Sequence, residues 1–286
     1  MRHRKLTVPL GAVLVLIAGC TKHEPPPATE VVAKRAAALP ADGRDPAWRQ
    51  APEFRAELLL QDLVEPRLLE ASTSAVRVRA LTDGRQVAFL LDWDDATRDE
   101  VPGAARFSDA CAVQLPHATE ADVPDPQMGN PGRPVDITLW RASWQAWVDG
   151  RADDIHSMYP NAAIDHYPFE AAALPPGSDA QREMAERYAP ARRLGNVMEG
   201  PRERAVEDLV GQGPGTLEPA EQQRSSGRGT RTPTGWQVLI VRPLPERLGP
   251  GGRSEIAFAV WNGDKHEVGA RKMRSAWVPF AVQGGA

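Results

Sequence analysis

Short apolar runs, separated by turn-forming residues, make up most of the chain after residue 40. Residues 76–79 alternate apolar and basic side chains, a period of two that is typical of a half-buried β-strand. Longer and mostly apolar runs predict further strands at 87–93, 135–140, 236–242 and 255–261. Gly, Pro and Asp punctuate the intervals. The pattern therefore predicts a mainly β fold, a β-sandwich with long insertions.

One stretch has the character of a helix. Residues 179 to about 194 are rich in Ala, Glu and Arg, which are good helix formers. This stretch lies within a long polar region, 148–234, that also carries a glycine-rich run at 211–215. A connection of this length inside a compact domain usually serves a function or binds a partner. We predict that it is an insertion with a short helical part.

The first 19 residues have the pattern of a lipoprotein signal peptide. Arg2, Arg4 and Lys5 form a basic start, an apolar run follows at 8–17, and small residues precede Cys20. The apolar run is shorter than the roughly 18 residues of a membrane span. We predict that Cys20 becomes the first residue of the mature chain and carries acyl chains that anchor it to a membrane. The alternative is an ordinary cleaved signal with a coincidental cysteine.

The domain organisation follows from this N-terminus. Residues 20–39 are Pro- and Ala-rich and are predicted to form a tether. Residues 40–286 are predicted to form one large β-domain, which is long enough to bury a substantial core. A lipid-anchored chain of this kind is expected outside the cytoplasm, in the periplasm or an equivalent compartment.

Charge and cysteine content restrict the partners. Removal of the signal peptide and its three basic residues leaves 31 basic against 38 acidic residues, a net charge of −7. A mildly acidic body argues against a nucleic-acid partner. Cys111 is the cysteine that remains beside Cys20, so an internal disulfide is not expected. Neither cysteine lies in a Cys-x-x-Cys-His run, which excludes covalent attachment of a c-type heme.

Motifs for catalysis are not apparent. The histidines at 117, 156, 166 and 266 have no two-ligand helical spacing, so a zinc site is not favoured. The chain also contains no Gly-x-Ser-x-Gly motif, no P-loop and no glycine fingerprint of a dinucleotide site. We therefore predict no catalytic residues.

Tryptophans and one methionine are the candidates for ligand contact. The eight tryptophans are many beside three tyrosines and six phenylalanines, and core packing is the expected role of most. A flat ligand such as a porphyrin, or a sugar, would also use them. Met128 lies in a turn-prone loop at 125–131. Its thioether either fills a gap in the core or binds an atom, and the residues alone leave both readings open.

Several segments together resemble a known family. The segment 126–141, with Met-Gly-Asn-Pro followed by Pro-Val-Asp-Ile-Thr-Leu-Trp-Arg, is similar to the γ subunits of type II dimethyl-sulfoxide-reductase-family molybdoenzymes, typified by ethylbenzene dehydrogenase. Further similar blocks cover most of the mature chain, although each alone is weakly specific: 42–48, 158–160, 206–209, 215–217, 235–236, 242–244, 258–263, 271–272 and Trp277. The resemblance implies a β-sandwich related to carbohydrate-binding-module-9 and DOMON domains.

The resemblance also implies a cofactor and its ligands. The family holds a non-covalent heme b between a methionine and a lysine, and these positions match Met128 and Lys272. Lys265 is the competing lysine, in a setting typical of an exposed turn. Ala270, Arg271 and Met273 depart from the residues usual in the family. Adjacent strand residues point to opposite faces, so Met273 is not expected to meet the same heme as Lys272.

The function that the resemblance implies is electron transfer, by a chain that is not itself an enzyme. The heme would relay electrons between the iron–sulfur clusters of a partner complex, whose catalytic subunit carries molybdopterin, and a soluble carrier such as a cytochrome. Lysine ligates iron only as the neutral amine, and reaching that state at pH 7 from a pKa of about 10.4 costs roughly 4.6 kcal/mol. Arg133, Arg141 and Arg271 are candidate propionate partners by charge. The alternatives are a lipid-anchored carbohydrate-binding sandwich and a heme-binding lipoprotein that works alone.

Overall fold

The computed structural model describes residues 28–101, 103, 105–118, 123–151, 160–161, 175, 178–188, 202–245 and 248–284. The predicted signal peptide and Cys20 lie outside these residues, as does the end of the predicted helix after residue 188. The strands are β1 (Val31–Arg35), β2 (Phe54–Glu57), β3 (Leu59–Leu60), β4 (Ala75–Thr82), β5 (Gln86–Asp94), β6 (Ala110–Pro116), β7 (Val135–Arg141), β8 (Val206–Gly211), β9 (Glu218–Pro219), β10 (Ser226–Arg231), β11 (Gly235–Pro243), β12 (Arg253–Trp261), β13 (Met273–Arg274) and β14 (Val278–Val282). The helices are the 3-10 helix η1 (Pro46–Gln50), α1 (Ala142–Val148) and α3 (Asp179–Tyr188).

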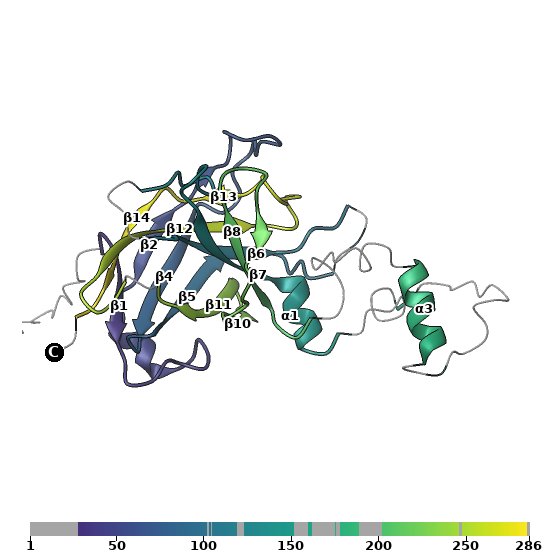
Figure 1. Ribbon diagram of the computed structural model, residues 1–286, viewed down its shortest axis with the longest axis horizontal. Coiled ribbons are helices and arrows are strands. Elements are labelled where there is room, and N and C mark those ends of the chain that lie inside the picture. Colours follow the sequence, from purple (N-terminus) through teal and green to yellow (C-terminus); the bar gives the residue numbers. More distant parts are fainter. Residues whose placement is uncertain are drawn as a thin grey trace, which may run out of the picture.

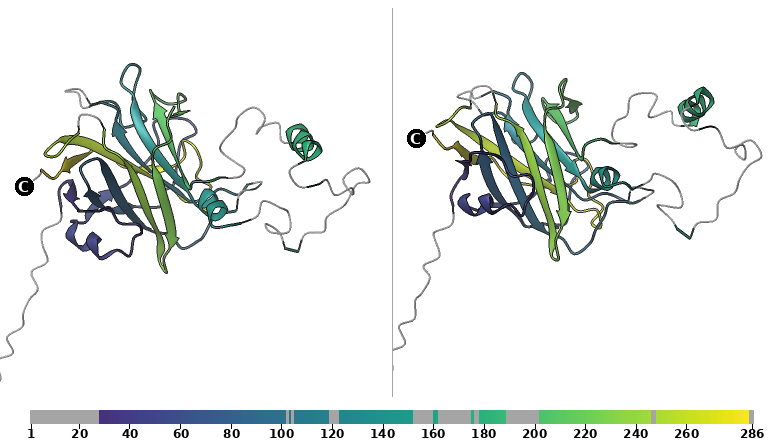
Figure 2. Two further views of the ribbon diagram at one scale, coloured as in Figure 1. Left: turned by 60° about the horizontal axis from the view of Figure 1, so that its bottom comes forward. Right: turned by 90° about the horizontal axis from the view of Figure 1, so that it is seen from below.

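The described strands form one continuous 14-stranded sheet that folds over into two layers (Figures 1 and 2). Its main path runs β10-β11-β5-β4-β1-β14-β12-β6-β7-β8-β9. β12 belongs to both layers, because its first half pairs with β14 and its second half pairs with β6. This shared strand forms the corner at which one layer passes into the other. The mainly β, sandwich-like fold expected from the sequence is confirmed.

The core between the layers follows from the period-two pattern of the strands. In β6, the side chains of Cys111, Val113 and Leu115 belong to the main buried cluster. Trp140 of β7 contacts both Trp93 of β5 and Trp236 of β11 edge to face, at centroid distances of 6.2 and 5.1 Å. Such contacts across the layers add to the stabilisation that burial of apolar area provides. The core-packing role expected for most tryptophans is confirmed for these three.

The predicted tether is wrong at residues 31–35. These residues form β1, which pairs in parallel with both β4 and β14 (Figure 1). Val31 and Ala33 are 1 % and 0 % exposed, because their side chains enter the core between the two neighbouring strands. The Pro- and Ala-rich surroundings of this strand obscured its alternation of apolar and polar positions.

The long polar insertion predicted for 148–234 is also too long. β8, β9 and β10 lie within it, and the last two are poor in apolar residues. β8 completes one layer beside β7, and β10 pairs with β11 at the other end of the strand order. Helix α3 (Asp179–Tyr188) confirms the first part of the predicted helix. α1, which was not predicted, packs at the end of β7 and against β10 (Figure 2).

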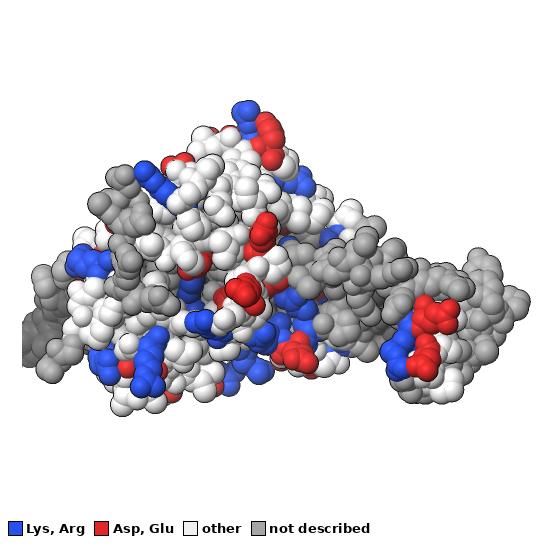
Figure 3. Space-filling model, viewed as in Figure 1, with Lys and Arg blue, Asp and Glu red and all other residues white. Residues whose placement is uncertain are grey.

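Acidic and basic side chains are interspersed on the face of the molecule seen in Figure 3. This mixed surface agrees with the small net charge and lacks the single-sign field of a nucleic-acid interface. Within the described residues, no helix has the length and apolar character needed to cross a membrane.

Candidate functional site

A cavity of about 470 Å³ lies on the outer face of the layer that contains β6, β7, β8 and β12. Its floor consists of the residues that alternate with the core residues along these strands. Those floor residues are Ala110, Ala112, Gln114, Ile137, Leu139, Arg141, Leu209, Ala257, Ala259 and Trp261. Four alanines occupy neighbouring positions on β6 and β12, where larger side chains would fill the space. The pattern of strand residues therefore provides a flat, mostly apolar floor.

Loops from distant parts of the sequence form the walls of the cavity. The residues that they contribute are Gln61, Val64, Glu65, 106–108, 126–128, Pro214, Gly215, Leu217, 267–270, Lys272, Arg274 and Ser275. The volume falls within the range of roughly 300 to 1,000 Å³ that is usual for small-molecule and cofactor sites. A largely apolar floor with a few polar groups in the walls is the usual form of such sites.

Met128 lies in the cavity wall and packs against the apolar residues of the floor. Its backbone has a φ of 69°, in the left-handed region that non-glycine residues seldom adopt. Its carbonyl accepts a hydrogen bond of 2.8 Å from the Gly213 amide. A Cβ at Gly211 would lie 2.9 Å from that carbonyl oxygen, so glycine allows the close approach. The surrounding structure thus holds Met128 in a conformation that costs of order 1–3 kcal/mol, as is common at functional sites.

Two side-chain hydrogen bonds fix the loop that carries Met128. The amide of Gln114 donates to the Pro126 carbonyl at 3.0 Å, and the indole of Trp277 donates to the Pro124 carbonyl at 2.6 Å. Gln114 is on β6 and Trp277 precedes β14, so the loop is attached at two separate places. The backbone of the loop that carries Met128 is therefore anchored to the rest of the domain.

Lys272 lines the same cavity and immediately precedes β13. Its Nζ lies 5.1 Å from the ring centroid of Trp261, and its carbonyl accepts a 3.1 Å hydrogen bond from the Gln61 amide. No described carboxylate pairs with the amine. Burial, assisted by the nearby positive charge of Arg274, lowers the pKa of Lys272 to about 8. An amine in this environment is much easier to deprotonate than an ordinary lysine.

Met273 faces away from the cavity. It is 2 % exposed and belongs to the main core cluster. The expectation that Lys272 and Met273 point in opposite directions is confirmed, because only the lysine is among the cavity-lining residues.

Lys265 has a different environment. It is exposed and forms an ion pair of 2.7 Å with Asp264. This partner raises the pKa of Lys265, and the residue does not line the cavity. Among the two lysines weighed from the sequence, the structure brings only Lys272 into the cavity beside Met128.

The arginines that line the cavity differ from those named by sequence. Arg141 lines the cavity, whereas Arg133 and Arg271 do not. Arg106 and Arg274 line it and were missed. Their sequence surroundings contain no apolar periodicity or motif that would have singled them out.

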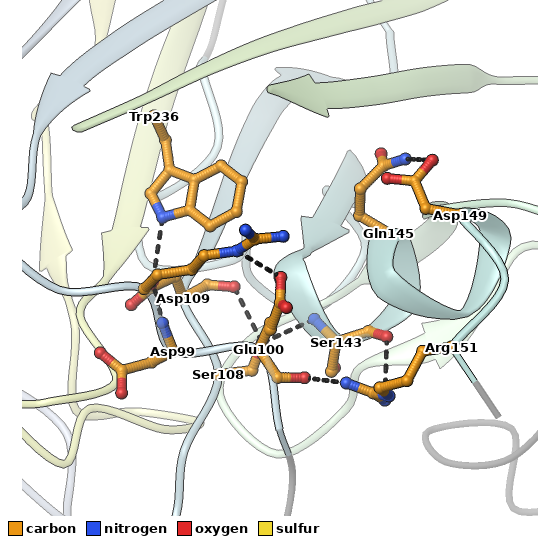
Figure 4. Close-up of polar contacts among 10 residues, drawn as sticks. Asp99, Glu100, Ser108, Asp109, Ser143, Gln145, Asp149, Arg151 and Trp236 are labelled. Carbon is orange, nitrogen blue, oxygen red and sulfur yellow. Dashed lines mark hydrogen bonds and ion pairs between the residues drawn. The ribbon is translucent and has the colours of Figure 1, made fainter. Parts of the chain in front are cut away.

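A buried carboxyl group lies between two cavity-lining residues of the chain, Ser108 and Ala110 (Figure 4). Asp109 is fully buried and accepts hydrogen bonds from the Trp236 indole at 2.9 Å, the Asp99 amide at 2.8 Å and the Gly263 amide at 2.9 Å. It therefore joins the start of β6 to β11 and to the turn after β12. Burial raises the pKa of Asp109 to about 7 against the opposing effect of these donors.

Neighbouring bonds continue the network of Figure 4. The Ser108 hydroxyl accepts a 2.9 Å bond from the Ser143 amide at the start of α1, and Arg151 bonds to the Glu100 carbonyl. Ser108 also lines the cavity. The short Ser-Asp-Ala sequence gave no sign of this role, since three residues carry no motif.

A second buried carboxyl group lies in the wall itself. Glu267 is 1 % exposed and accepts a 2.9 Å hydrogen bond from the Asn262 amide. Burial raises the pKa of Glu267, and the negative charge of Asp95 contributes to the shift. The wall thus combines a thioether, an amine of lowered pKa and several charged groups around an apolar floor.

The chain is similar in sequence to known proteins. The sequence model of the family described as Ethylbenzene dehydrogenase matches residues 45–273. The chain belongs to the ethylbenzene dehydrogenase family. The matched range contains both Met128 and Lys272, and it excludes the N-terminal 44 residues.

Other matches to this ethylbenzene dehydrogenase family chain are more distant. A protein of Haloferax mediterranei, named as a respiratory nitrate reductase heme subunit, is 23 % identical over 241 residues, covering 82 % of this chain and 65 % of that protein. The chain thus spans 65 %, slightly less than two thirds, of the length of that relative.

Solved structures with a related arrangement include a family 9 carbohydrate-binding module from Caldicellulosiruptor kristjanssonii. In complex with cellotriose, it matches at 8 % identity with a TM-score of 0.44, covering 90 % of this chain and 94 % of that one. In complex with glucose, the TM-score is 0.38 at 8 % identity, with coverage of 90 % and 96 %. The likeness at these scores is loose.

Proposed function

We propose that this protein is a heme b-binding electron-transfer subunit of a molybdenum oxidoreductase complex, and that Met128 and Lys272 are the axial ligands of the heme iron. One observation carries the proposal: Met128 and Lys272, which are far apart in the sequence, line the same apolar cavity. The family membership and the heme subunit named among its relatives support the same role.

The residues present fit a non-covalent heme. The alanines of β6 and β12 leave apolar space in the cavity, and Met128 and Lys272 in its wall would hold the heme iron. Thioether sulfur and neutral nitrogen are both donors that heme iron accepts. When bound with both ligands, the heme would carry single electrons and have no open position for oxygen or substrate.

The environment of Lys272 reduces the main cost of this ligation. Only the neutral amine can bind iron, and the folded protein has already lowered the pKa of Lys272 to about 8. Deprotonation at pH 7 then costs roughly 1.4 kcal/mol, at about 1.36 kcal/mol per pKa unit. An ordinary lysine would require roughly three times as much. Burial thus favours the neutral amine of Lys272 that binds iron, and the anchored loop backbone keeps Met128 at the cavity.

The partners follow from the proposed role. Electrons would pass between this subunit and iron–sulfur clusters of a partner, whose catalytic subunit carries molybdopterin, and a soluble carrier such as a cytochrome would exchange them on the other side. We propose that Cys20 bears the lipid that holds the mature chain on a membrane, outside the cytoplasm. Replacement of Cys20 by Ala should then move the protein from the membrane fraction to the soluble fraction.

The test is the absorption spectrum of the purified full chain with heme b. We expect a Soret band and, after reduction, the sharp α band of six-coordinate low-spin iron. Met128→Ala and Lys272→Ala should each abolish the six-coordinate low-spin form, because each removes one ligand. Lys265→Ala is the matched control and should leave the spectrum unchanged. Loss of the low-spin spectrum in Lys265→Ala but not in Lys272→Ala would refute the ligand assignment.

A further inference from the structure

We propose that Arg274 is a carboxylate-binding residue of the cavity and that it holds an acidic group of the bound ligand. The inference rests on the proposed function, in which that acidic group is a propionate of heme b.

The position of Arg274 follows from the local strand geometry. Met273 and Arg274 form β13, in which Arg274 is paired with Ala259 of the cavity floor. Adjacent strand residues point to opposite faces, so Lys272 and Arg274 share the cavity side while Met273 enters the core. Two residues of one short segment therefore face the same bound molecule. They are Lys272, the proposed ligand of the iron, and Arg274, which carries a fixed positive charge.

The guanidinium of Arg274 lacks a strong partner among the described residues. Its Nη1 donates to the Ser275 carbonyl at 3.4 Å, which is long for a hydrogen bond, and its Nε is buried without a partner. No ion pair joins it to a described carboxylate. Asp62, whose negative charge acts on Arg274, is exposed and beyond ion-pair distance.

An unpaired, partly buried cation is costly, and a bound anion removes the cost. Arginine suits a carboxylate in particular, because its planar fork can donate two parallel hydrogen bonds. The two carboxyl groups in the wall do not fill this role: Glu267 accepts from the Asn262 amide, and Glu65 forms its ion pair with Arg67 at 2.7 Å. The free donors of Arg274 are thus available to a ligand in the cavity.

Arg202 illustrates the contrast. It pairs with Glu207 at 3.2 Å and stacks 3.9 Å from the centroid of the Trp144 ring. That arginine has a structural role in the protein, with both its charge and its flat face satisfied. Arg274 has neither kind of partner recorded within the described part of the chain.

The experiment compares two forms of the ligand in the full chain. Ferric heme b carries two propionates, and its dimethyl ester carries none, while the ring and iron are unchanged. We measure the affinity of each form for the wild type and for Arg274→Gln by titration at the Soret band. The wild type should prefer heme b by roughly 10- to 100-fold, the range of one charge-assisted hydrogen bond. In Arg274→Gln, most of this preference should disappear.

Arg133→Gln is the matched control, since Arg133 is an exposed arginine outside the cavity wall. It should keep the wild-type preference. Equal affinity of the wild type for the two forms, or an undiminished preference in Arg274→Gln, would overturn the role of Arg274 while leaving the heme site intact. A wild type that binds neither form with a low-spin spectrum would instead overturn the proposed function.

Discussion

Replacement of Lys272 by Leu should stabilise the heme-free protein while removing its heme ligation. In the folded chain, the amine has no carboxylate partner among the described residues, and burial lowers the pKa of Lys272 to about 8 from its ordinary value of 10.5. The folded state therefore binds this proton less tightly than the unfolded state does. Below pH 8 both states are protonated, and the penalty on folding is complete; it disappears as the pH rises from 8 to 10.5.

The size of the effect follows from the same values. A difference of about 2.5 pKa units corresponds to roughly 3.4 kcal/mol of unfolding free energy at pH 7 and to less than about 1 kcal/mol at pH 10. Because Lys272 is only half-buried, screening by solvent reduces these figures. We expect the gain from Lys272→Leu to be about 2 kcal/mol larger at pH 7 than at pH 10. The apolar contact of leucine contributes equally at both pH values.

The assay is urea unfolding of the heme-free full chain, monitored by tryptophan fluorescence at pH 7 and pH 10. Lys265→Leu is the matched control. Asp264 raises the pKa of Lys265, so loss of this lysine should produce no gain at neutral pH. Equal gains from Lys272→Leu at the two pH values would show that the amine is not desolvated, and the account of why Lys272 suits iron would then be wrong.

Three further substitutions test the cavity and its support. Ala259→Leu places a larger side chain on the cavity floor and should abolish uptake of heme b, whereas Ala276→Leu, at an exposed position, should not; Soret titration measures both. Asp109→Asn replaces one accepting oxygen by an NH2 group that cannot accept, so at least one of the three N–H donors loses its partner. The unfolding free energy in urea should fall by about 1–3 kcal/mol, and a change below about 0.5 kcal/mol would contradict the network. Gly229→Ala sets a Cβ 2.1 Å from the Trp140 ring and should cost about 1–3 kcal/mol in thermal unfolding, while Gly249→Ala, with open space around it, should be neutral.

The strands that could be predicted are those with a clear apolar pattern. Residues 87–93, 135–140, 236–242 and 255–261 all fall in observed strands, because burial against a core imposes that pattern on the sequence. β6 was missed, since all seven of its residues are buried and no alternation remains. One of its faces enters the core and the other forms the cavity floor, so both are largely apolar.

The candidate site divides in the same way. Met128 and Lys272 were identified by resemblance to a family, and the sequence alone left each with an ordinary structural role. The tertiary structure placed both in one cavity, and it separated Lys272 from Lys265 by their exposure and ion pairing. Arg274 and Asp109 were found only in the structure, because their environments are made by segments distant in the chain.

The sequence by itself determined the β character of the domain, the burial of most tryptophans and the family to which the chain belongs. These depend on local alternation and on recurrent residue blocks, which are properties of neighbouring positions. The tertiary structure alone decided that four alanines on β6 and β12 lie side by side and leave room for a flat ligand. It also decided that Lys272, which lines the same cavity, is buried enough for its pKa to fall. Empty volume and desolvation arise only when distant segments pack together, so no local pattern can encode them.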